Sequence, residues 1–167
     1  FTDCILHAAG QADLLAMWHL NMEDFVIEQY ANQADLTFLF RLEPWLYNGY
    51  PWSAALKGKK VLVIHPFEDT IRAQYERRSK LFPGTDILPE FELHTLKAIQ
   101  TLCGEKDDRF GTWFEALDYM YKEAMKIDFD IAIIGCGAYG MPLAAMLKEA
   151  GKQAIHLGGA TQLLFGI

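Results

Sequence analysis

The sequence predicts an α/β fold with a doubly wound, mostly parallel sheet of about five or six strands and helices on both faces. Short apolar runs rich in β-branched and aromatic residues alternate with stretches of helical periodicity, which is typical of βαβ units. Val61–Ile64 and Ile131–Ile134 are apolar without alternation, as expected for central strands that are buried on both faces. Glycines or histidines follow several of these runs. Together these observations predict a Rossmann-like arrangement.

The first part of the chain is predicted to be helix, strand, helix and strand. Apolar residues at helical spacing predict the first helix, which Gly10 ends. Asn21 can cap the second helix, and the acids after it suit the positive end of the helix dipole. The predicted order is helix Phe1–Ala9, strand Asp13–Trp18, helix Met22–Gln33, strand Leu36–Arg41, a proline- and aromatic-rich loop over Glu43–Trp52, and a helical turn over Ser53–Lys57.

The second part alternates more regularly. Pro142 suits the first turn of a helix, and Gly151 ends that helix. The weakly alternating segment Leu96–Leu102 is interpreted as helix, while Ile87–Leu93 is ambiguous because Pro89 interrupts it. The predicted order is strand Val61–His65, helix Glu68–Leu81, helix Thr112–Ile127, strand Ile131–Ile134, helix Pro142–Ala150 and strand Gln153–Leu157.

Length and composition predict one α/β domain over residues 1–167, and we expect it to be a fragment of a longer protein. The net charge of −7 argues against a nucleic-acid partner, for which a basic stripe is expected. No apolar run reaches the roughly 18 residues of a membrane span, and no signal peptide is visible. Three widely spaced cysteines form no disulfide or zinc pattern. We therefore predict a cytoplasmic protein without a transmembrane segment.

Histidines lie at the predicted strand ends, where open parallel sheets bind their ligands. His19, His65 and His156 all fall there. A histidine at such a place can donate a hydrogen bond to phosphate or act as a base. Each could instead make an ordinary structural hydrogen bond. His65 is our candidate for a catalytic histidine.

A glycine motif follows the strand Ile131–Ile134 and precedes a helix. It has the form G-x-G-x-x-G, in which glycines let backbone N–H groups approach a phosphate at a helix N-terminus. The alternative is a tight turn that packs the helix closely against the strand. We predict nucleotide binding by Gly135, Gly137, Ala138, Tyr139 and Gly140.

A second loop of the same kind follows the last strand. If the two strands are neighbours, as a short crossover predicts, the two loops lie side by side and could hold a diphosphate. The loop also offers hydroxyl and amide groups that could bind sugar hydroxyls or a base edge. The predicted binding residues are His156, Gly158, Gly159, Thr161 and Gln162.

Two well-known uses of the glycine motif fit this sequence poorly. A dinucleotide-binding unit needs an acid about 20 residues further on, but His156 stands there. A methyltransferase often has an acid two residues before its first glycine, where this chain has Ile133.

Glu90 and Glu92 form a further candidate site, because carboxylates at i and i+2 share a face when the chain is extended. They could act as catalytic bases or bind a divalent cation, or simply face solvent.

The stretch from His65-Pro66-Phe67 to Gly166 resembles the GT-D-type glycosyltransferase-like domains of bacteria. Its most distinctive segments are Ile134–Gly140 and Ile155–Gly166. Such domains occur in surface-polysaccharide and glycoprotein assembly. The resemblance implies transfer of a hexose from a nucleotide diphosphate sugar to a carbohydrate or glycoprotein acceptor, usually with a divalent metal such as Mn or Mg.

The resemblance assigns no metal ligand, because the family's Arg-Phe-Gly segment leading to an acid would precede Phe1. The alternatives are a non-catalytic nucleotide-binding module and, third, an S-adenosylmethionine-dependent methyltransferase.

Aromatic side chains in the proline-rich loop could stack on sugars or bases, or could cap the core. They are Trp45, Tyr47, Tyr50 and Trp52.

Overall fold

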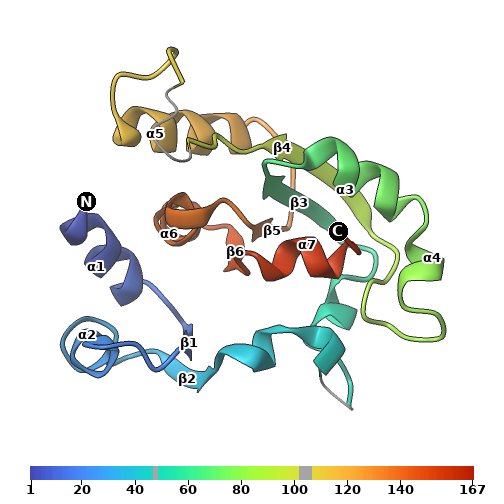
Figure 1. Cartoon of the computed structure of the whole chain (residues 1–167), viewed down its shortest axis with the longest axis horizontal. Coiled ribbons are helices and arrows are strands. Elements are labelled where there is room, and N and C mark those ends of the chain that lie inside the picture. The colour runs from blue at the N-terminus through green and yellow to red at the C-terminus, as the bar shows by residue number, and fades with distance from the viewer. Residues whose placement is uncertain (47–48, 102–106) are drawn as a thin grey trace.

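The computed structural model describes residues 1–46, 49–101 and 107–167. It shows a mixed α/β architecture with parallel sheets, so the predicted class is confirmed. The prediction of one sheet of five or six strands is wrong, because the described strands form a pair and a separate sheet of four (Figure 1). The strands are β1 (Leu14–Met17), β2 (Asp35–Phe38), β3 (Lys60–His65), β4 (Glu92–Lys97), β5 (Ile131–Ile134) and β6 (Gln153–His156). The helices are α1 (Thr2–Gly10), α2 (Glu23–Tyr30), α3 (Glu68–Tyr75), α4 (Arg78–Leu81), α5 (Trp113–Ala124), α6 (Gly140–Glu149) and α7 (Ala160–Leu164).

The four-stranded sheet has the order β4-β3-β5-β6, so β3 and β5 are its inner strands, as predicted. Their side chains alternate between two cores, one on each face of the sheet. Leu62 and Ile64 belong to the first core, which contains buried residues of α5 and α6. Val61 and Val63 belong to the second core, which contains buried residues of α3 and α7. Burial on both faces explains why these strands have no polar alternation.

The N-terminal strands β1 and β2 pair only with each other among the described strands. Helix α1 lies against α6, and His7 Nε2 of α1 lies 2.7 Å from Glu149 Oε1 of α6. Lys148 Nζ of α6 donates to Oδ1 of Asp13, which lies between α1 and β1, at 2.7 Å. Large apolar side chains of the pair, including Leu14 and Phe38, are exposed. The apolar patterns predict these strands but not the neighbours with which they pair.

The edge strand β4 corrects the interpretation of Leu96–Leu102 as helix. Thr95 and Leu96 pair with Val63 and Ile64 of β3, and the strand ends at Lys97. An edge strand has a neighbouring strand on one side only, and the inner residues of β4 are half-buried. A half-buried edge strand lacks the continuous apolar run that identifies an inner strand.

Local sequence signals place several helix ends. Thr112 and Glu115 form a capping box at the start of α5: Thr112 Oγ1 accepts from the Glu115 N–H at 3.2 Å, and Glu115 Oε2 accepts from the Thr112 N–H at 3.3 Å. The predicted helix Glu68–Leu81 is instead divided into α3 and α4. Within the described ranges, no helix is both long and apolar enough to cross a membrane.

Candidate functional site

The predicted glycine loops lie next to each other at the carboxyl edge of the four-stranded sheet. The Gly135 N–H donates to the Ile64 carbonyl at 2.9 Å, which ties the loop after β5 to the end of β3. The N–H groups of Leu157 and Gly158 both donate to the Ile134 carbonyl, at 3.0 and 3.1 Å. The ends of β3, β5 and β6 therefore form one continuous edge.

This edge lies where the direction of chain progression changes. From β3 the chain continues to β4 on one side, whereas from β5 it continues to β6 on the other. The loops after β3 and β5 consequently leave toward different neighbours. In open parallel sheets, ligands bind in the crevice outside the carboxyl ends at such a point.

Gly135 is a packing residue at the centre of this edge. A Cβ atom at this position would lie 2.7 Å from His65 Cδ2, 2.7 Å from Thr161 Oγ1 and 2.8 Å from the Gly158 carbonyl oxygen. Such contacts are too short for any side chain, so only glycine lets the three loops meet. Gly135 is buried and does not itself present backbone to solvent.

Gly140, the last glycine of the motif, also serves packing. It has ordinary helical geometry, and a Cβ there would collide with the His156 ring. Tyr139 is buried and its ring stacks on Trp113, with centroids 4.8 Å apart and planes at 6°. The structure therefore assigns Tyr139 to the core. The alternative interpretation of the motif, close packing of helix on strand, applies to its outer glycines.

The middle glycine, Gly137, is different because it is exposed. Its φ of +59° is a left-handed conformation that favours glycine, and a Cβ there would meet nothing within 4 Å. Gly137 and the exposed Ala138 open the turn that leads into α6. The N–H groups of Tyr139 and Gly140 already donate to the carbonyls of Cys136 and Gly137. Among the described residues, the free donors at the start of this helical segment are therefore the N–H groups of Gly137 and Ala138. The exposed Gly159, where a Cβ would also meet nothing within 4 Å, adds open backbone from the second loop.

His65 is buried at the end of β3, with 2% of its surface exposed. Its Nδ1 accepts a hydrogen bond from the Phe67 N–H at 3.0 Å, so the ring hydrogen of the neutral form lies on Nε2. Burial lowers the pKa of His65 below its ordinary value. His65 is therefore a neutral donor through Nε2 at pH 7.

Two buried polar atoms near the same edge have no hydrogen-bond partner among the described residues. They are Nε2 of His156 and Oγ1 of Thr161. Burial also lowers the pKa of His156, so its ring is neutral as well. Buried polar atoms are nearly always satisfied in folded proteins. Unsatisfied atoms behind the two glycine loops are candidates for hydrogen bonds to water or ligand. Gln162 is half-buried on α7 beside Thr161.

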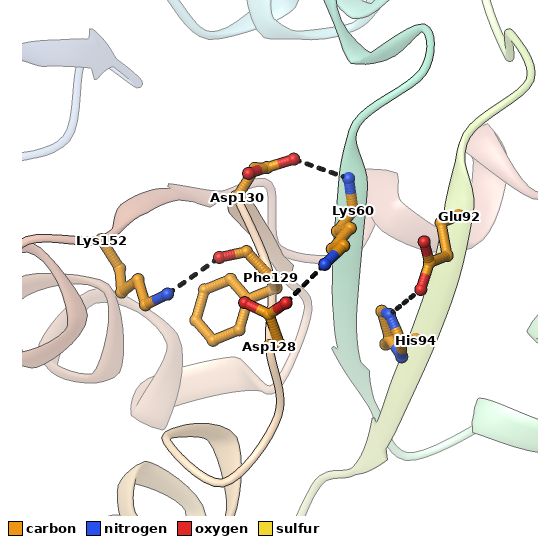
Figure 2. Close-up of polar contacts among 7 residues, drawn as sticks. All are labelled: Lys60, Glu92, His94, Asp128, Phe129, Asp130 and Lys152. Atoms are coloured by element: carbon orange, nitrogen blue, oxygen red, sulfur yellow. Dashed lines mark hydrogen bonds and ion pairs between the residues drawn. The ribbon is translucent and has the colours of Figure 1, made fainter.

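The predicted catalytic carboxylates lie at the opposite edge of the sheet. Glu92 opens β4 and pairs in register with Lys60, the first residue of β3. Its Oε1 lies 2.9 Å from His94 Nε2, among the polar contacts around Lys60 that Figure 2 shows. Glu90 makes an ion pair with Arg78 at 3.0 Å. Five residue steps of about 3.3 Å each separate Glu92 from the His65 end, roughly 16 Å. The structure does not bring these carboxylates to His65.

The sequence interpretation missed a cavity of about 540 Å³ at the carboxyl ends of β3 and β4. Polar side chains from separate parts of the chain line it. Part of its wall is the carboxyl end of β4, which the sequence pattern does not identify as a strand. A strand assignment for residues 92–97 would have predicted Lys97 as a strand-end residue. The polar lining includes Glu68, Thr95, Lys97, Gln100, Asp107 and Arg109.

No group of three or more His, Cys, Asp or Glu side chains that could hold a metal ion occurs within the described ranges. His65 and His156 come to the edge without a carboxylate of the predicted pair, so these residues alone do not fit a divalent metal. Tyr47 of the aromatic loop lies outside the described residues. Comparisons of the chain with family models, with curated proteins and with solved structures found no match.

Proposed function

We propose that this chain binds the diphosphate of a nucleotide sugar at the carboxyl edge of β3, β5 and β6. The observation that carries the proposal is the exposed, left-handed Gly137 at the turn into α6, next to the open Gly159 loop. Backbone N–H groups at such a turn suit an anion because they combine free donors with the positive end of a helix. We interpret the surrounding sheet as doubly wound and Rossmann-like, with the ligand at its switch point.

We further propose that the bound sugar is transferred to a carbohydrate or glycoprotein acceptor, as the resemblance to GT-D-type domains implies. In this reaction an acceptor hydroxyl oxygen forms a bond to C1 of the hexose. The bond from C1 to the diphosphate oxygen breaks, its electron pair leaves with the nucleotide diphosphate, and the hydroxyl proton passes to solvent. His65 suits the role of a neutral donor that stabilises charge on the leaving diphosphate, rather than that of a base.

A non-catalytic nucleotide-binding module is the second candidate, and the position of Glu90 and Glu92 favours it. Both carboxylates lie at the amino edge of the sheet, far from Gly137 and His65. A module of this kind needs the glycine loops but no acid or base. Binding and turnover therefore have to be measured separately.

A ligand panel tests the proposal. The melting temperature of the chain is measured with UDP, UDP-hexoses, S-adenosylmethionine and NAD, each with and without Mn²⁺. A ligand at 100 times its dissociation constant stabilises by about 2.7 kcal/mol, which raises the melting temperature of a domain of this size by about 5–10 °C. We expect this shift with UDP-hexoses, and the Mn²⁺ arm tests the divalent-metal dependence that the resemblance to GT-D-type domains implies.

Release of UDP from UDP-hexose in the presence of acceptors then distinguishes transferase from module. Binding without turnover would favour the module. Stabilisation by S-adenosylmethionine alone would contradict both candidates and favour a methyltransferase. A cytoplasmic location stays a prediction.

A further inference from the structure

The N-terminal part of the chain carries most of the exposed apolar side chains and nearly all of the net charge. Residues 1–40 contain six aspartates or glutamates and no lysine or arginine, a formal charge of −6, so the rest of the chain contributes only −1 to the total of −7. Ten of the 16 large apolar side chains that are exposed among the described residues belong to the same segment. Apolar surface gathered in this way, with charged groups around it, is typical of an interaction site.

Part of this surface is an open groove between α2 and β2, which we call the α2–β2 groove. It has a volume of about 570 Å³, and the turn after β1, the first turns of α2 and Leu36 of β2 line it. Leu20, Met22 and Leu36 are 47% to 62% exposed there. The His19 ring lies 5.7 Å from the Phe38 ring, which extends the apolar surface along β2.

Helix α2 has no fully buried side chain. A surface helix normally buries one apolar stripe against the rest of its domain. Helix α2 lies at the periphery of the molecule and contacts α1 (Figure 1). Phe25 is nevertheless 46% exposed, and Ile27 lines the groove without being fully buried. The apolar side chains of α2 therefore remain available to a further element.

The chain does not neutralise the carboxylates of this groove. Glu23, Asp24 and Glu28 line it, and none of them makes an ion pair within the described ranges. Glu23 accepts hydrogen bonds from the backbone N–H groups of Trp18 and Leu20, at 2.9 and 3.2 Å, which hold the turn after β1 in place. Asp24 and Glu28 are four residues apart and so lie on one face of α2. The groove thus combines apolar walls with uncompensated negative charge.

This negative charge narrows the kinds of partner. Nucleic acids and anionic lipid surfaces carry the same sign of charge and are repelled. A symmetric contact between two copies of this surface would place like carboxylates against each other, which is unfavourable. The complementary partner is apolar and positively charged.

We propose that the α2–β2 groove binds a basic amphipathic helix of another protein. The apolar side chains of that helix enter the groove, and its lysines or arginines pair with Asp24 and Glu28. A helix suits this arrangement because its own side chains at i and i+4 have the same spacing as the two carboxylates. The assignment does not depend on the proposed nucleotide-sugar site.

The test uses three synthetic peptides of about 15 residues, a length at which an isolated helix begins to form in water. The first has leucines at i, i+3, i+4 and i+7 and lysines on the other face. The second has glutamates in place of the lysines. The third has the composition of the first in an order that leaves no apolar face. Their dissociation constants are measured by NMR titration of the chain at low ionic strength.

We expect the first peptide to bind most tightly. A surface ion pair is worth up to about fivefold in affinity, so two pairs predict a preference of about tenfold over the glutamate peptide. Burial of even one leucine is worth about tenfold or more, which predicts a similar preference over the peptide without an apolar face. Equal binding of the three peptides, or no binding of the first, would overturn the proposal.

Variants locate the binding. Leu20→Ser should weaken the first peptide about tenfold, and Glu28→Gln about two- to fivefold. Leu163→Ser and Glu76→Gln are the matched controls: Leu163 is 52% exposed on α7, and Glu76 is an exposed acid without an ion pair among the described residues. Both controls should leave binding within about twofold, and all four variants should keep the melting temperature of the parent chain, because surface substitutions change stability little. Unchanged binding in Leu20→Ser would overturn the proposal.

Sedimentation of the chain alone tests the other occupant of the groove. We expect a monomer whose state does not change in Leu20→Ser. A dimer that Leu20→Ser dissociates would show that a second copy covers the groove, and the proposal would fail. Binding of UDP enters none of these measurements, so this proposal and the nucleotide-sugar proposal stand or fall separately.

Discussion

The imidazole of His156 occupies the space that a side chain at position 140 would need. A Cβ atom on Gly140 would lie 2.2 Å from Cδ2 and 2.3 Å from Nε2 of that ring. The last glycine of the motif and the last residue of β6 are thus fitted to each other, which holds the start of α6 close to the sheet.

Gly140→Ala is expected to destabilise the chain by about 1–3 kcal/mol, because the added methyl group overpacks against the His156 ring. In a His156→Ala background the sign should reverse. Gly140 has helical backbone geometry, and alanine is favoured over glycine in a helix by up to about 1 kcal/mol. Urea unfolding of the four proteins of this double-mutant cycle measures the coupling. Equal effects of Gly140→Ala in both backgrounds would show that the ring is not the obstacle.

Gly137→Val is expected to abolish nucleotide binding, since its side chain would cover the open backbone of the turn. Gly151→Val is the matched control at the other end of α6: it has a φ of +81°, and a Cβ there also meets nothing within 4 Å. Both substitutions force a left-handed conformation on valine and should cost about 1–2 kcal/mol or more. Titration calorimetry with UDP should show loss of binding for Gly137→Val only. Normal binding by that variant would leave the motif as a packing device.

Acidification is expected to destabilise the fold through His65 and His156. Burial lowers the pKa of both in the folded chain below the ordinary value of 6.5, so the unfolded chain binds more protons in this range. Stability is therefore fully present above about pH 6.5 and falls as the pH drops from there toward the folded-state pKa values. The double variant His65→Asn, His156→Asn should show a flatter dependence between pH 7 and 5 in urea unfolding. If the free energy of unfolding depended on pH with the same slope in parent and variant, these two histidines would not be the cause.

Trp52→Ala is expected to lower stability by about 2–4 kcal/mol, whereas Tyr50→Ala should change it little. Trp52 packs against the second core and its Nε1 donates to the Leu42 carbonyl at 2.9 Å, while Tyr50 is 77% exposed. Trp45 packs there too, stacked on Phe82. These contacts favour the core-capping interpretation of the aromatic loop. Thermal unfolding of both variants checks it, and a small effect of Trp52→Ala would restore the ligand-stacking hypothesis.

The strands that the sequence predicts best are those whose environment is uniform. Val61–Ile64 and Ile131–Ile134 are buried on both faces, so their residues share one apolar environment and the apolar run is continuous. The edge strand Glu92–Lys97 mixes half-buried and exposed positions, so its pattern does not identify a strand, and a helix is predicted from Leu96 onward. The pairing of β1 with β2 alone was not predictable, because an apolar run gives no information about its neighbour, whereas the short crossover correctly predicts that β5 and β6 are neighbours.

Some features of the candidate site likewise follow from the sequence, and others depend on the tertiary structure. The sequence by itself determined that glycines and histidines follow the strands β3, β5 and β6, because these are local features of the chain. Only the tertiary structure decided that Gly135 and Gly140 are packing positions and Gly137 the exposed one, since this depends on where His65, His156 and Thr161 arrive from other strands and loops. It also separated Glu90 and Glu92 from the site, because parallel register puts the first residue of β4 at the far edge of the sheet.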